Sequence, residues 1–489
     1  MLLKDVLKNI NYEVVKGNID VEINDICYNS KNVKENDAFI ALVGHNIDGH
    51  KYIEDAIKNG AKVVFVEKDV QLDSDVTVIK LNDTRRSLAL LSSNLFDNPS
   101  KKIKMIGITG TKGKTTTTWM IKRILEEDNK SVGVIGTMGV FINDKHYDLV
   151  NTTPESYDIH KYLKEMVDNN IEYAVMEVSS QALKLGRVDG ITFDYGVFTN
   201  LTHDHIGDGE HASMEEYIEC KSLLFKQSIH GIFNIDDNNY NKMINGCTCD
   251  INTFGYDKKA NLYCDKVELL REKGIIGISM TTGGVISDTF KINTPGTFSA
   301  YNAMCAMLTT FLIGCSIDSM KKALSTIAVK GRVEPVSISD KFDLLIDYAH
   351  NGVSTESILT TIREYNPKRI VTIFGCGGNR SKDRRYEMGE VSGRLADFSI
   401  ITADNSRYED VNDIINDILI GMHKTNGKYV TIPDRKEAIK YSIVNAKEGD
   451  IILLLGKGHE DYQEINGIRK PFDERVIIKE ILEELKYNK

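Results

Sequence analysis

Residues 107–118 read GITGTKGKTTTT, which brings glycines, a lysine and threonines together at the spacing of a phosphate-binding loop. Gly110 and Gly113 let the backbone bend where a side chain would collide with a phosphate. Lys114 would reach the terminal phosphates, and Thr115 would place its hydroxyl on Mg²⁺. The strict pattern G-x-x-x-x-G-K-[ST] is not met, because Ile108 stands where its first glycine belongs. The loop nevertheless predicts a site for a nucleoside triphosphate.

Polar side chains also follow other predicted strands in the middle of the chain. Glu177 follows EYAVM, where its carboxylate could hold Mg²⁺ opposite Thr115, although a solvated acid is an equally good interpretation. His205 follows the next predicted strand. Lys221 lies on an amphipathic helix, where composition alone favours a solvated lysine.

Three polar loops follow strands in the last third of the chain: FGCGGNRSKDRR, TADNSRYED and GKGHEDY. Loops at the carboxyl ends of neighbouring parallel strands converge on one crevice. Arg380, Arg407 and Glu460 would then offer both charge signs to a zwitterionic ligand. The alternative is three ordinary polar loops.

The elements that must hold these loops alternate between strand and helix. The run KMIGI before the first loop and WMIKRILEE after it predict a strand and a helix, and AKVVFVEK, VTVIKL, SVGVIGT, DYGVFTN and GIFNI predict further strands. Such alternation indicates parallel sheets covered by helices. Residues 260–293 break the alternation and predict antiparallel strands. We therefore predict an α/β protein.

The chain has 489 residues, too many for one core, so three domains are expected. We place them at residues 1–100, 101–333 and 334–489. The central domain is predicted to be a parallel-sheet ATPase domain with the phosphate-binding loop, and the last a Rossmann-like α/β domain.

Composition excludes several classes of protein. Hydrophobic residues make up 41% of the chain and charged residues 27%, as in ordinary soluble proteins, and no run of 18 apolar residues predicts a membrane span. The net charge is −10 without a basic cluster, so no nucleic-acid partner is expected. Eight scattered cysteines and an N-terminus without a signal-peptide core favour free thiols in the cytoplasm. We expect a monomer.

Several motifs, in this order, are similar to one family: GITGTKGKTTTT, NTTPES, MEVSSQAL, GRV, VFTNLTHDH, MEEYIECKSLLF, YNA, GRVEP, DYAH, FGCGGNR and LLLGKGHEDYQ. Together they resemble the Mur ligases of peptidoglycan synthesis, and most closely those of the MurE type. These ligases add the third amino acid of the stem peptide to UDP-N-acetylmuramoyl-L-alanyl-D-glutamate. The earlier segment CYNSKNVKENDAFIALVGHNIDGHKYI resembles the family's uridine-binding segment, which implies a UDP-substrate-binding first domain.

The resemblance implies an ATP-dependent amide ligase. The γ-phosphate passes to the side-chain carboxylate of the substrate's D-glutamate, and the incoming amine attacks the resulting acyl phosphate. A free carboxylate is a poor electrophile, so phosphorylation supplies the leaving group, while Mg²⁺ and Lys114 offset the charge that gathers during transfer.

The resemblance also assigns roles to residues. The catalytic set is Lys114, Glu177, His205 and Lys221. The metal ligands are Thr115, Glu177, His205 and Lys221, the last as a carbamate formed with CO₂. The ATP contacts are Gly110, Thr111, Lys112, Gly113, Lys114, Thr115, Thr116, Asn302, Arg332 and Asp347. The contacts to the UDP-muramoyl dipeptide are Ser30, Thr152, Thr153, Ser179 and Arg187. The contacts to the amino acid are Arg380, Asp404, Asn405, Arg407, Gly456 and Glu460.

Two departures from the family pattern concern the site. The segment DHIGDGEHAS is longer than the family's D-H-L-D-x-H-G, so we leave His211 out of the predicted site. The family's diaminopimelate-adding members carry D-N-P-R, and this chain has Asp404-Asn405-Ser406-Arg407. Pro sets a loop's backbone, whereas an Arg fork pairs with a carboxylate. Diaminopimelate has a second carboxylate and lysine has none, so the kept Arg407 favours meso-diaminopimelate.

Three alternatives stay open. The same reaction could use L-lysine or another diamino acid. A sibling ligase, such as a folylpolyglutamate synthase or a cyanophycin-type enzyme, would share the chemistry but not the uridine segment or GKGHEDYQ. A regulatory switch or motor would share the phosphate-binding loop but would not need Glu177, His205 and Lys221.

Overall fold

The computed structural model describes residues 1–44, 47–203, 206–207, 211–272 and 275–487. The chain divides into two compact units, which are described separately. The first comprises residues 1–263, 284–286 and 301–320, and the second comprises residues 264–283, 287–300 and the chain from residue 321 onward. Among the described residues, no helix combines the length and the apolar character needed to cross a bilayer.

The first unit begins with a five-stranded sheet of order β1-β5-β4-β3-β2, in which only β1 runs antiparallel to its neighbour. Its strands are β1 (Tyr12–Lys16), β2 (Ile26–Cys27), β3 (Ala38–Ile40), β4 (Val63–Val66) and β5 (Thr77–Leu81). Its helical segments are α1 (Leu3–Val6), η1 (Ser30–Asn32), η2 (Gly49–Tyr52), α2 (Ile53–Lys58), α3 (Thr84–Leu95) and η3 (Pro99–Lys101). The strands predicted from AKVVFVEK and VTVIKL are β4 and β5.

The larger sheet has the order β16-β15-β14-β13-β12-β11-β6-β10-β7-β8-β9. Its first eight strands in the chain are β6 (Lys104–Thr109), β7 (Val132–Gly136), β8 (Gly139–Ile142), β9 (Lys145–Tyr147), β10 (Tyr173–Glu177), β11 (Phe193–Phe198), β12 (Ser228–Asn234) and β13 (Asp250–Gly255). The strands from β13 to β7 in this order are parallel, whereas β8 and β9 add antiparallel pairs. The helices of this region are α4 (Lys114–Glu127), α5 (Ser156–Asp168), α6 (Ser180–Lys184), α7 (Met214–Lys226), α8 (Tyr240–Met243) and α9 (Phe298–Ile313).

Strand register brings the predicted loops to one edge of this sheet. Glu177, the last residue of β10, pairs with Ile108 of β6, and Phe198, the last residue of β11, pairs with Thr109. Because these strands are parallel, the loops that follow β6, β10 and β11 leave the sheet side by side. The strand β6 is buried after its first residue, which accounts for its continuous apolar run.

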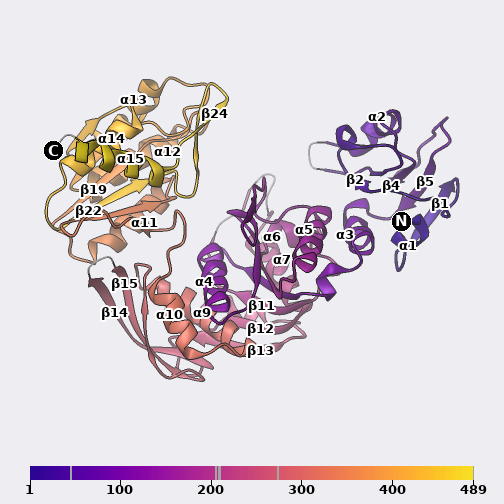
Figure 1. Cartoon of the computed structure of the whole chain (residues 1–489), viewed down its shortest axis with the longest axis horizontal. Coiled ribbons are helices and arrows are strands. Elements are labelled where there is room, and N and C mark those ends of the chain that lie inside the picture. Colours follow the sequence, from indigo (N-terminus) through magenta and orange to yellow (C-terminus); the bar gives the residue numbers. More distant parts are fainter. Residues whose placement is uncertain (45–46, 204–205, 208–210, 273–274, 488–489) are drawn as a thin grey trace. The chain divides into compact units, whose positions relative to one another are not determined.

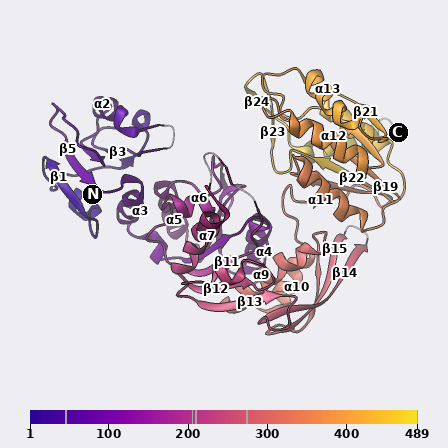
Figure 2. The ribbon, with the colours of Figure 1, turned by 180° about the vertical axis from the view of Figure 1, so that it is seen from behind.

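Three strands are present at 260–293, where the sequence predicts antiparallel strands. They are β14 (Leu262–Glu272), β15 (Ile275–Gly284) and β16 (Thr289–Ile292). The strand β15 pairs with β16 in antiparallel fashion, as predicted, whereas β14 pairs with β13 in parallel. Both views of the chain show β14 and β15 as long neighbouring arrows (Figures 1 and 2). The helix α10 (Ile317–Ser325) follows.

The second unit contains a six-stranded sheet of order β17-β18-β22-β19-β20-β21, parallel except for β17. Its strands are β17 (Glu334–Pro335), β18 (Asp343–Asp347), β19 (Arg369–Phe374), β20 (Phe398–Ile401), β21 (Tyr429–Thr431) and β22 (Asp450–Leu455). The helices are α11 (Gly352–Arg363), α12 (Asp383–Leu395), α13 (Val411–Met422), α14 (Arg435–Val444) and α15 (Glu474–Tyr487), drawn in orange and yellow around β19 and β22 (Figure 1).

A hairpin of β23 (Tyr462–Ile465) and β24 (Ile468–Pro471) completes this unit, and the sequence analysis did not predict it. The three polar loops predicted to converge follow β19, β20 and β22, which are adjacent or next-but-one in the sheet. The Rossmann-like α/β character of this region is therefore confirmed.

Candidate active site

The loop between β6 and α4 has the backbone geometry of an anion cradle. Gly110 and Gly113 have φ angles of +150° and +84°, a region that disfavours side chains. A Cβ at Gly110 would lie 2.0 Å from Thr199 Oγ1, and one at Gly113 would lie 2.3 Å from Asn302 Oδ1. Gly113 is the N-cap of α4 and offers no side-chain cap. The first N–H groups of α4 are therefore suited to bind a phosphate.

Lys114 lies over this loop. Its ammonium donates to the carbonyl oxygens of Gly110 at 2.8 Å and Thr111 at 3.0 Å. The predicted ATP contacts Thr111, Lys112, Thr115 and Thr116 lie in the same loop or in the first turn of α4. The ammonium group of Lys114 therefore lies where it could pair with a phosphate bound in the loop.

Residues after β11 hold the loop in shape. Asn200 accepts a hydrogen bond from Lys112 N at 3.0 Å through Oδ1 and one from Thr111 N at 2.9 Å through its backbone carbonyl. Thr199 Oγ1 donates to Lys112 O at 2.8 Å. Sequence analysis did not assign these two residues, although the motif VFTNLTHDH contains both and follows a strand.

Glu177 is not a solvated acid. It is 1% exposed, and its Oε2 accepts hydrogen bonds from Thr115 Oγ1 and Thr137 Oγ1, each at 3.0 Å. Its Oε1 accepts from Thr137 N at 3.0 Å. A Cβ at Gly136 would lie 2.4 Å from Glu177 Oε1, so the close approach requires glycine. The predicted pair of Glu177 and Thr115 is brought together, and Thr137, at the end of β7, is a member that the sequence analysis missed.

Lys221 is also buried, with 2% of its surface exposed. The helix α7 begins after Ser213, whose side chain accepts from Glu216 N at 3.2 Å, and this start directs Lys221 towards the sheet. Its Nζ donates to Gly110 O at 3.0 Å and lies 4.6 Å from the centre of the Tyr217 ring. The solvated-lysine interpretation is therefore wrong, because the helix turns Lys221 towards the loop. His205 lies outside the described residues.

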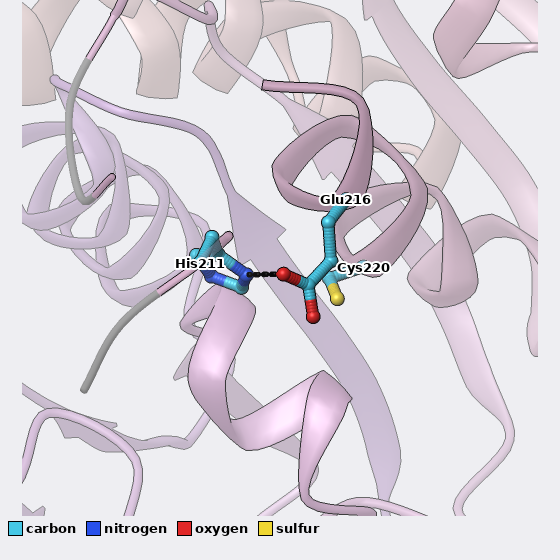
Figure 3. A group of neighbouring side chains, drawn as sticks. All are labelled: His211, Glu216 and Cys220. Carbon is cyan, nitrogen blue, oxygen red and sulfur yellow. Dashed lines mark ion pairs between the residues drawn. The ribbon is translucent and has the colours of Figure 1, made fainter. Parts of the chain in front are cut away.

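His211, which we left out of the predicted site, is buried beside α7. Its Nε2 lies 2.9 Å from Ser180 Oγ, and its Nδ1 lies 4.0 Å from Glu216 Oε2. It stands close to Cys220 as well (Figure 3). His211 is thus fixed in the structure, on the helix side of the lengthened segment.

Predicted contacts to the muramoyl dipeptide form a second hydrogen-bonded group at the same sheet edge. Thr153 Oγ1 donates to Glu177 O at 2.8 Å and accepts from Ser179 N at 3.0 Å. Thr152 Oγ1 lies 3.1 Å from Thr137 Oγ1. Arg187 donates to Thr153 O at 2.9 Å. Four predicted residues, Thr152, Thr153, Ser179 and Arg187, are therefore connected to the Glu177 cluster.

Glu155 was missed by the sequence analysis and orders this group. Its Oε1 lies 3.0 Å from Arg187 Nη2 and 2.7 Å from Arg85 Nη1, so one carboxylate holds two guanidinium groups. Glu155 stands in the NTTPES motif, which was the available signal. Ser30 lies apart from this group. It is 8% exposed and begins η1, and its carbonyl accepts from Asn59 Nδ2 at 2.9 Å.

The remaining predicted nucleotide contacts lie in both units. Asn302 lies against Gly113 in the first unit. In the second unit, Arg332 stacks over the Tyr348 ring at 5.3 Å, and the carboxylate of Asp347 accepts from Val333 N and Ala349 N, each at 2.8 Å. Burial raises the pKa of Asp347, and the charge of Arg332 opposes that shift.

The loops of the second unit bring Arg380 and Arg407 to one glycine. A Cβ at Gly377 would lie 3.7 Å from Arg380 Cγ and 3.9 Å from Arg407 Nη1. Arg407 has a φ of +52°, and its Nη1 donates to Gly378 O at 2.8 Å. Its Nε lies 3.7 Å from Glu464 Oε2. In this geometry the guanidinium could bind a carboxylate of a ligand. Arg407 also stabilises the loop itself, through its hydrogen bond to Gly378 O.

A buried lysine that the sequence analysis missed joins the other predicted residues. Lys457 is fully buried, and its Nζ lies 3.1 Å from Asn405 Oδ1, 3.3 Å from Glu460 Oε2 and 3.5 Å from Asp404 Oδ1. Burial raises the pKa of Glu460, and Lys457 opposes that shift. Gly456, with φ +108°, would place a Cβ 2.8 Å from Asp404 Oδ2. Lys457 stands in the GKGHEDY motif, which was the signal available for it.

The donor atoms suit the cofactors that the sequence implies. Hydroxyl and carboxylate oxygens from Thr115 and Glu177 are buried together, as a hard cation such as Mg²⁺ prefers. A carbamate on Lys221 would add anionic oxygen beside the loop, since Nζ already lies against Gly110 O.

Comparison with known proteins finds the Mur ligase family along nearly the whole chain. Family models match for the Mur ligase family catalytic domain at residues 22–94, the Mur ligase middle domain at 108–310 and the glutamate ligase domain at 331–458. The UDP-N-acetylmuramoyl-L-alanyl-D-glutamate--2,6-diaminopimelate ligase of Clostridium perfringens is 41% identical over 490 residues, covering 99% of this chain and 100% of the relative.

Two further matches agree. The ligase of the same name from Caldanaerobacter subterraneus subsp. tengcongensis is 42% identical over 488 residues and covers 99% of both chains. A solved structure of a protein with that name has a TM-score of 0.73 at 25% identity and covers 99% of both chains. The chain therefore belongs to the Mur ligase family.

Proposed function

We propose that the protein is the ATP-dependent ligase that adds meso-diaminopimelate to UDP-N-acetylmuramoyl-L-alanyl-D-glutamate in peptidoglycan synthesis. The observation that carries this proposal is the full-length similarity to ligases of that name, together with Arg407 in the D-N-x-R motif. The matched family ranges also support three domains at 1–100, 101–333 and 334–489.

The reaction forms an amide from a carboxylate. The γ-phosphate of ATP is transferred to the side-chain carboxylate of D-glutamate, and ADP leaves. The amine of diaminopimelate then attacks the acyl carbon, and the tetrahedral species collapses with loss of inorganic phosphate and a proton. Transfer concentrates negative charge on the phosphoryl oxygens, so fixed cations near them lower the barrier.

The phosphate-binding loop would hold ATP. Its backbone N–H groups and Lys114 face the phosphates, while Asn302, Arg332 and Asp347 contact the nucleotide. Mg²⁺, when bound, would supply positive charge at the transferring phosphate. Thr115, Glu177, His205 and the carbamate of Lys221 would hold it.

The proposal that Lys221 is carbamylated is supported by the short distance of two lysine ammonium groups from one carbonyl oxygen. Lys114 Nζ and Lys221 Nζ donate to the same carbonyl, that of Gly110, at 2.8 and 3.0 Å. Two positive charges this close repel each other, most of all in a buried setting. Carbamylation by CO₂ reverses the sign of charge on Lys221, so the repulsion becomes an attraction.

The muramoyl dipeptide would lie along Thr152, Thr153, Ser179 and Arg187, with its uridine end at Ser30. The amino acid would bind at Arg380, Asp404, Asn405, Arg407, Gly456 and Glu460. Carboxylates of Asp404 and Glu460 can accept from an ammonium of the amino acid. The arginines can pair with its carboxylates, and diaminopimelate has one carboxylate more than lysine.

The decisive experiment is ADP release by the purified full-length protein with UDP-N-acetylmuramoyl-L-alanyl-D-glutamate and a panel of amino acids. We expect release with meso-diaminopimelate and little with L-lysine, L-ornithine or L-glutamate. A preference for L-lysine would show that the proposed amino-acid substrate is wrong, while the proposed ligase reaction would stand. Release with folate and L-glutamate alone would indicate the sibling folylpolyglutamate synthase instead.

We also propose that the protein acts in the cytoplasm as a monomer. None of the eight cysteines, all of which lie in the described ranges, forms a disulfide, as expected in a reducing compartment. Light scattering of the purified protein tests the oligomeric state.

A further inference from the structure

Three side chains of different chemistry meet beside α7 (Figure 3). His211 precedes the helix, and Glu216 and Cys220 lie one turn apart on it. One donor atom from each residue lies within 4.8 Å of the others. His211 and Cys220 are buried, at 1% and 7% exposure, and Glu216 is partly buried.

Hydrogen bonds orient two of these groups. Ser180 Oγ lies 2.9 Å from His211 Nε2, and the His211 ring packs on Tyr217 with centroids 5.1 Å apart. The other ring nitrogen, Nδ1, faces Glu216 Oε2 at 4.0 Å. Glu216 Oε2 accepts from Ala212 N at 2.7 Å, and its Oε1 pairs with Lys184 at 2.7 Å. A partner on the second nitrogen is what typically fixes a histidine as a metal ligand.

We propose that His211, Glu216 and Cys220 bind a thiophilic divalent cation of the zinc type. Nitrogen, carboxylate oxygen and thiolate sulfur are the three ligand types of protein zinc sites, and three protein ligands leave one position for water or another donor. Thiolate ligands select zinc over the hard cation Mg²⁺. The site is separate from the Mg²⁺ ligands Thr115 and Glu177, with which it shares no residue.

The geometry requires a small contraction. Ligand atoms of a tetrahedral zinc site lie about 3.5 Å apart, from metal–ligand distances of about 2.0–2.3 Å. The donor atoms here lie within 4.8 Å of one another. Side-chain rotations that move these atoms by about an ångström would bring them to the distances of a zinc site. Glu216 and Cys220 share one helix face at i and i+4, where such rotations do not disturb the backbone.

Two of the three side chains border a cavity. Glu216 and Cys220, together with Lys184, are among the residues that line a cavity of about 660 Å³ in the first unit. A cation bound there would tie the segment before α7 and, through Ser180, α6 to the helix that carries Lys221. We therefore expect zinc to stabilise the protein.

Cobalt(II) is the probe for the test, because thiolate ligation gives it a charge-transfer band in the near ultraviolet. The full-length protein is titrated with CoCl₂ in the presence of excess Mg²⁺. We expect one equivalent to bind with that band, and ZnCl₂ to displace it and raise Tm. Absence of a thiolate band in the wild-type protein would overturn the proposal.

Matched variants identify the ligands. Cys220→Ser should remove the charge-transfer band. Cys249→Ser should keep it, because Cys249 is not one of the proposed ligands. Cys249 is the matched control because Cys247 and Cys249 form a CxC pair, which could bind the metal instead. A band that disappears in Cys249→Ser and persists in Cys220→Ser assigns the metal to that pair and sinks the proposal. Glu216→Gln, which keeps the side-chain shape, should weaken binding without changing the fold.

The orienting bond gives a further readout. Ser180→Ala should keep the band but weaken cobalt affinity roughly 10- to 100-fold, as loss of such partners does. Unchanged affinity in both Ser180→Ala and Glu216→Gln would contradict the ligand set. None of these measurements uses ligase activity, so their outcome is independent of the proposed reaction.

Discussion

Lys114 is the residue whose charge is most directly tied to phosphoryl transfer. Its ammonium lies on two loop carbonyls, at 2.8 and 3.0 Å, and is partly exposed rather than buried in the core. Removing it deletes a charge without opening a cavity in the core. The consequence should therefore appear in the rate and not in the stability.

Lys114→Ala should lower kcat for ADP release on the order of 10³-fold, the loss typical of a group that acts on transition-state charge. Thermal unfolding should stay within a few degrees of the wild-type protein. The measurement is a coupled ADP assay together with circular dichroism melting. Near-normal turnover would exclude a role for Lys114 at the phosphate.

Lys221 makes a different prediction because its proposed active form is a carbamate. Lys221→Ala should be nearly inactive, and short carboxylic acids such as acetate should partly restore turnover by placing an anionic oxygen in the vacated space. Lys226→Ala, an exposed lysine on the same helix, is the matched control and should behave as wild type. Failure of Lys221→Ala to lose activity would remove the carbamate from the mechanism.

The proposed role of Arg407 is to select the amino acid by pairing with its second carboxylate. Arg407→Ala should lower kcat/KM for diaminopimelate about 30-fold to several-thousand-fold, since removing one partner of a buried charge pair costs roughly 2–5 kcal/mol. The weak use of L-lysine should change little, so the ratio of the two substrates is the diagnostic quantity.

The control for Arg407 is Arg384→Ala, an exposed arginine of the same unit, which should leave both rates unchanged. Equal loss with both substrates in Arg407→Ala would mean that the side chain holds the loop through Gly378 O rather than reading the ligand.

At the scale of elements, α5 joins two cores. Its Tyr157 belongs to the core under the N-terminal sheet, and its Ile159, Leu163 and Met166 belong to the core of the larger sheet. His160, on the same helix, is fully buried, and neither ring nitrogen has a hydrogen-bond partner in the described part of the chain. Burial lowers the pKa of His160 from 6.5 to about 4.

This shift makes α5 sensitive to acid. Because the folded pKa lies below the unfolded one, the stability that neutral His160 contributes is fully present above pH 6.5 and is lost as the pH falls towards 4. At pH 5 the loss from His160 is about 2 kcal/mol, at 1.36 kcal/mol per pH unit.

The test compares urea unfolding at pH 7.5 and pH 5. His160→Leu cannot ionise, so its free energy of unfolding should fall about 2 kcal/mol less than that of the wild-type protein over this range. His423→Gln, an exposed histidine, should fall as much as wild type. Identical pH dependence in His160→Leu and wild type would contradict the buried neutral histidine.

At the scale of the whole molecule, two compact units imply more than one unfolding transition. In the second unit, the buried pair of Arg435 and Glu474, 2.8 Å apart and both fully buried, links α14 to α15. Arg435 also donates to Ala403 O at 3.2 Å and Leu455 O at 2.9 Å. These carbonyls immediately precede Asp404 and Gly456, so the pair supports both loops that are proposed to bind the amino acid.

Arg435→Met should lower the stability of the second unit by roughly 3–5 kcal/mol, because Glu474 is left buried without its charge partner. Hydrogen exchange should increase in α14, α15 and the two loops, while α4 and α7 keep their protection. KM for diaminopimelate should rise. In the double variant, Glu474→Leu should recover much of the stability that Arg435→Met loses. An equal increase of hydrogen exchange in both units of Arg435→Met would contradict the prediction that the two units unfold separately.

Much of the fold could be predicted from the sequence because it depends on short-range patterns. Apolar runs predicted the strands β6, β10 and β11, and the helix predicted from WMIKRILEE is α4. Glu177 was expected at a strand end because parallel strands expose their carboxyl ends at one edge. The hairpin of β23 and β24 was missed, since its burial pattern is uniform and shows no alternation.

The sequence by itself determined the family, the phosphate-binding loop and the residue types available for a ligase site, because these follow from motifs along the chain. Only the tertiary structure decided which of them are buried together. It placed Lys221 inward, brought Thr137 to Glu177, and enclosed Lys457 among Asp404, Asn405 and Glu460. It also brought Cys220 to His211. The reason is physical: burial and charge pairing depend on which strands and helices are neighbours, and no local pattern encodes that choice.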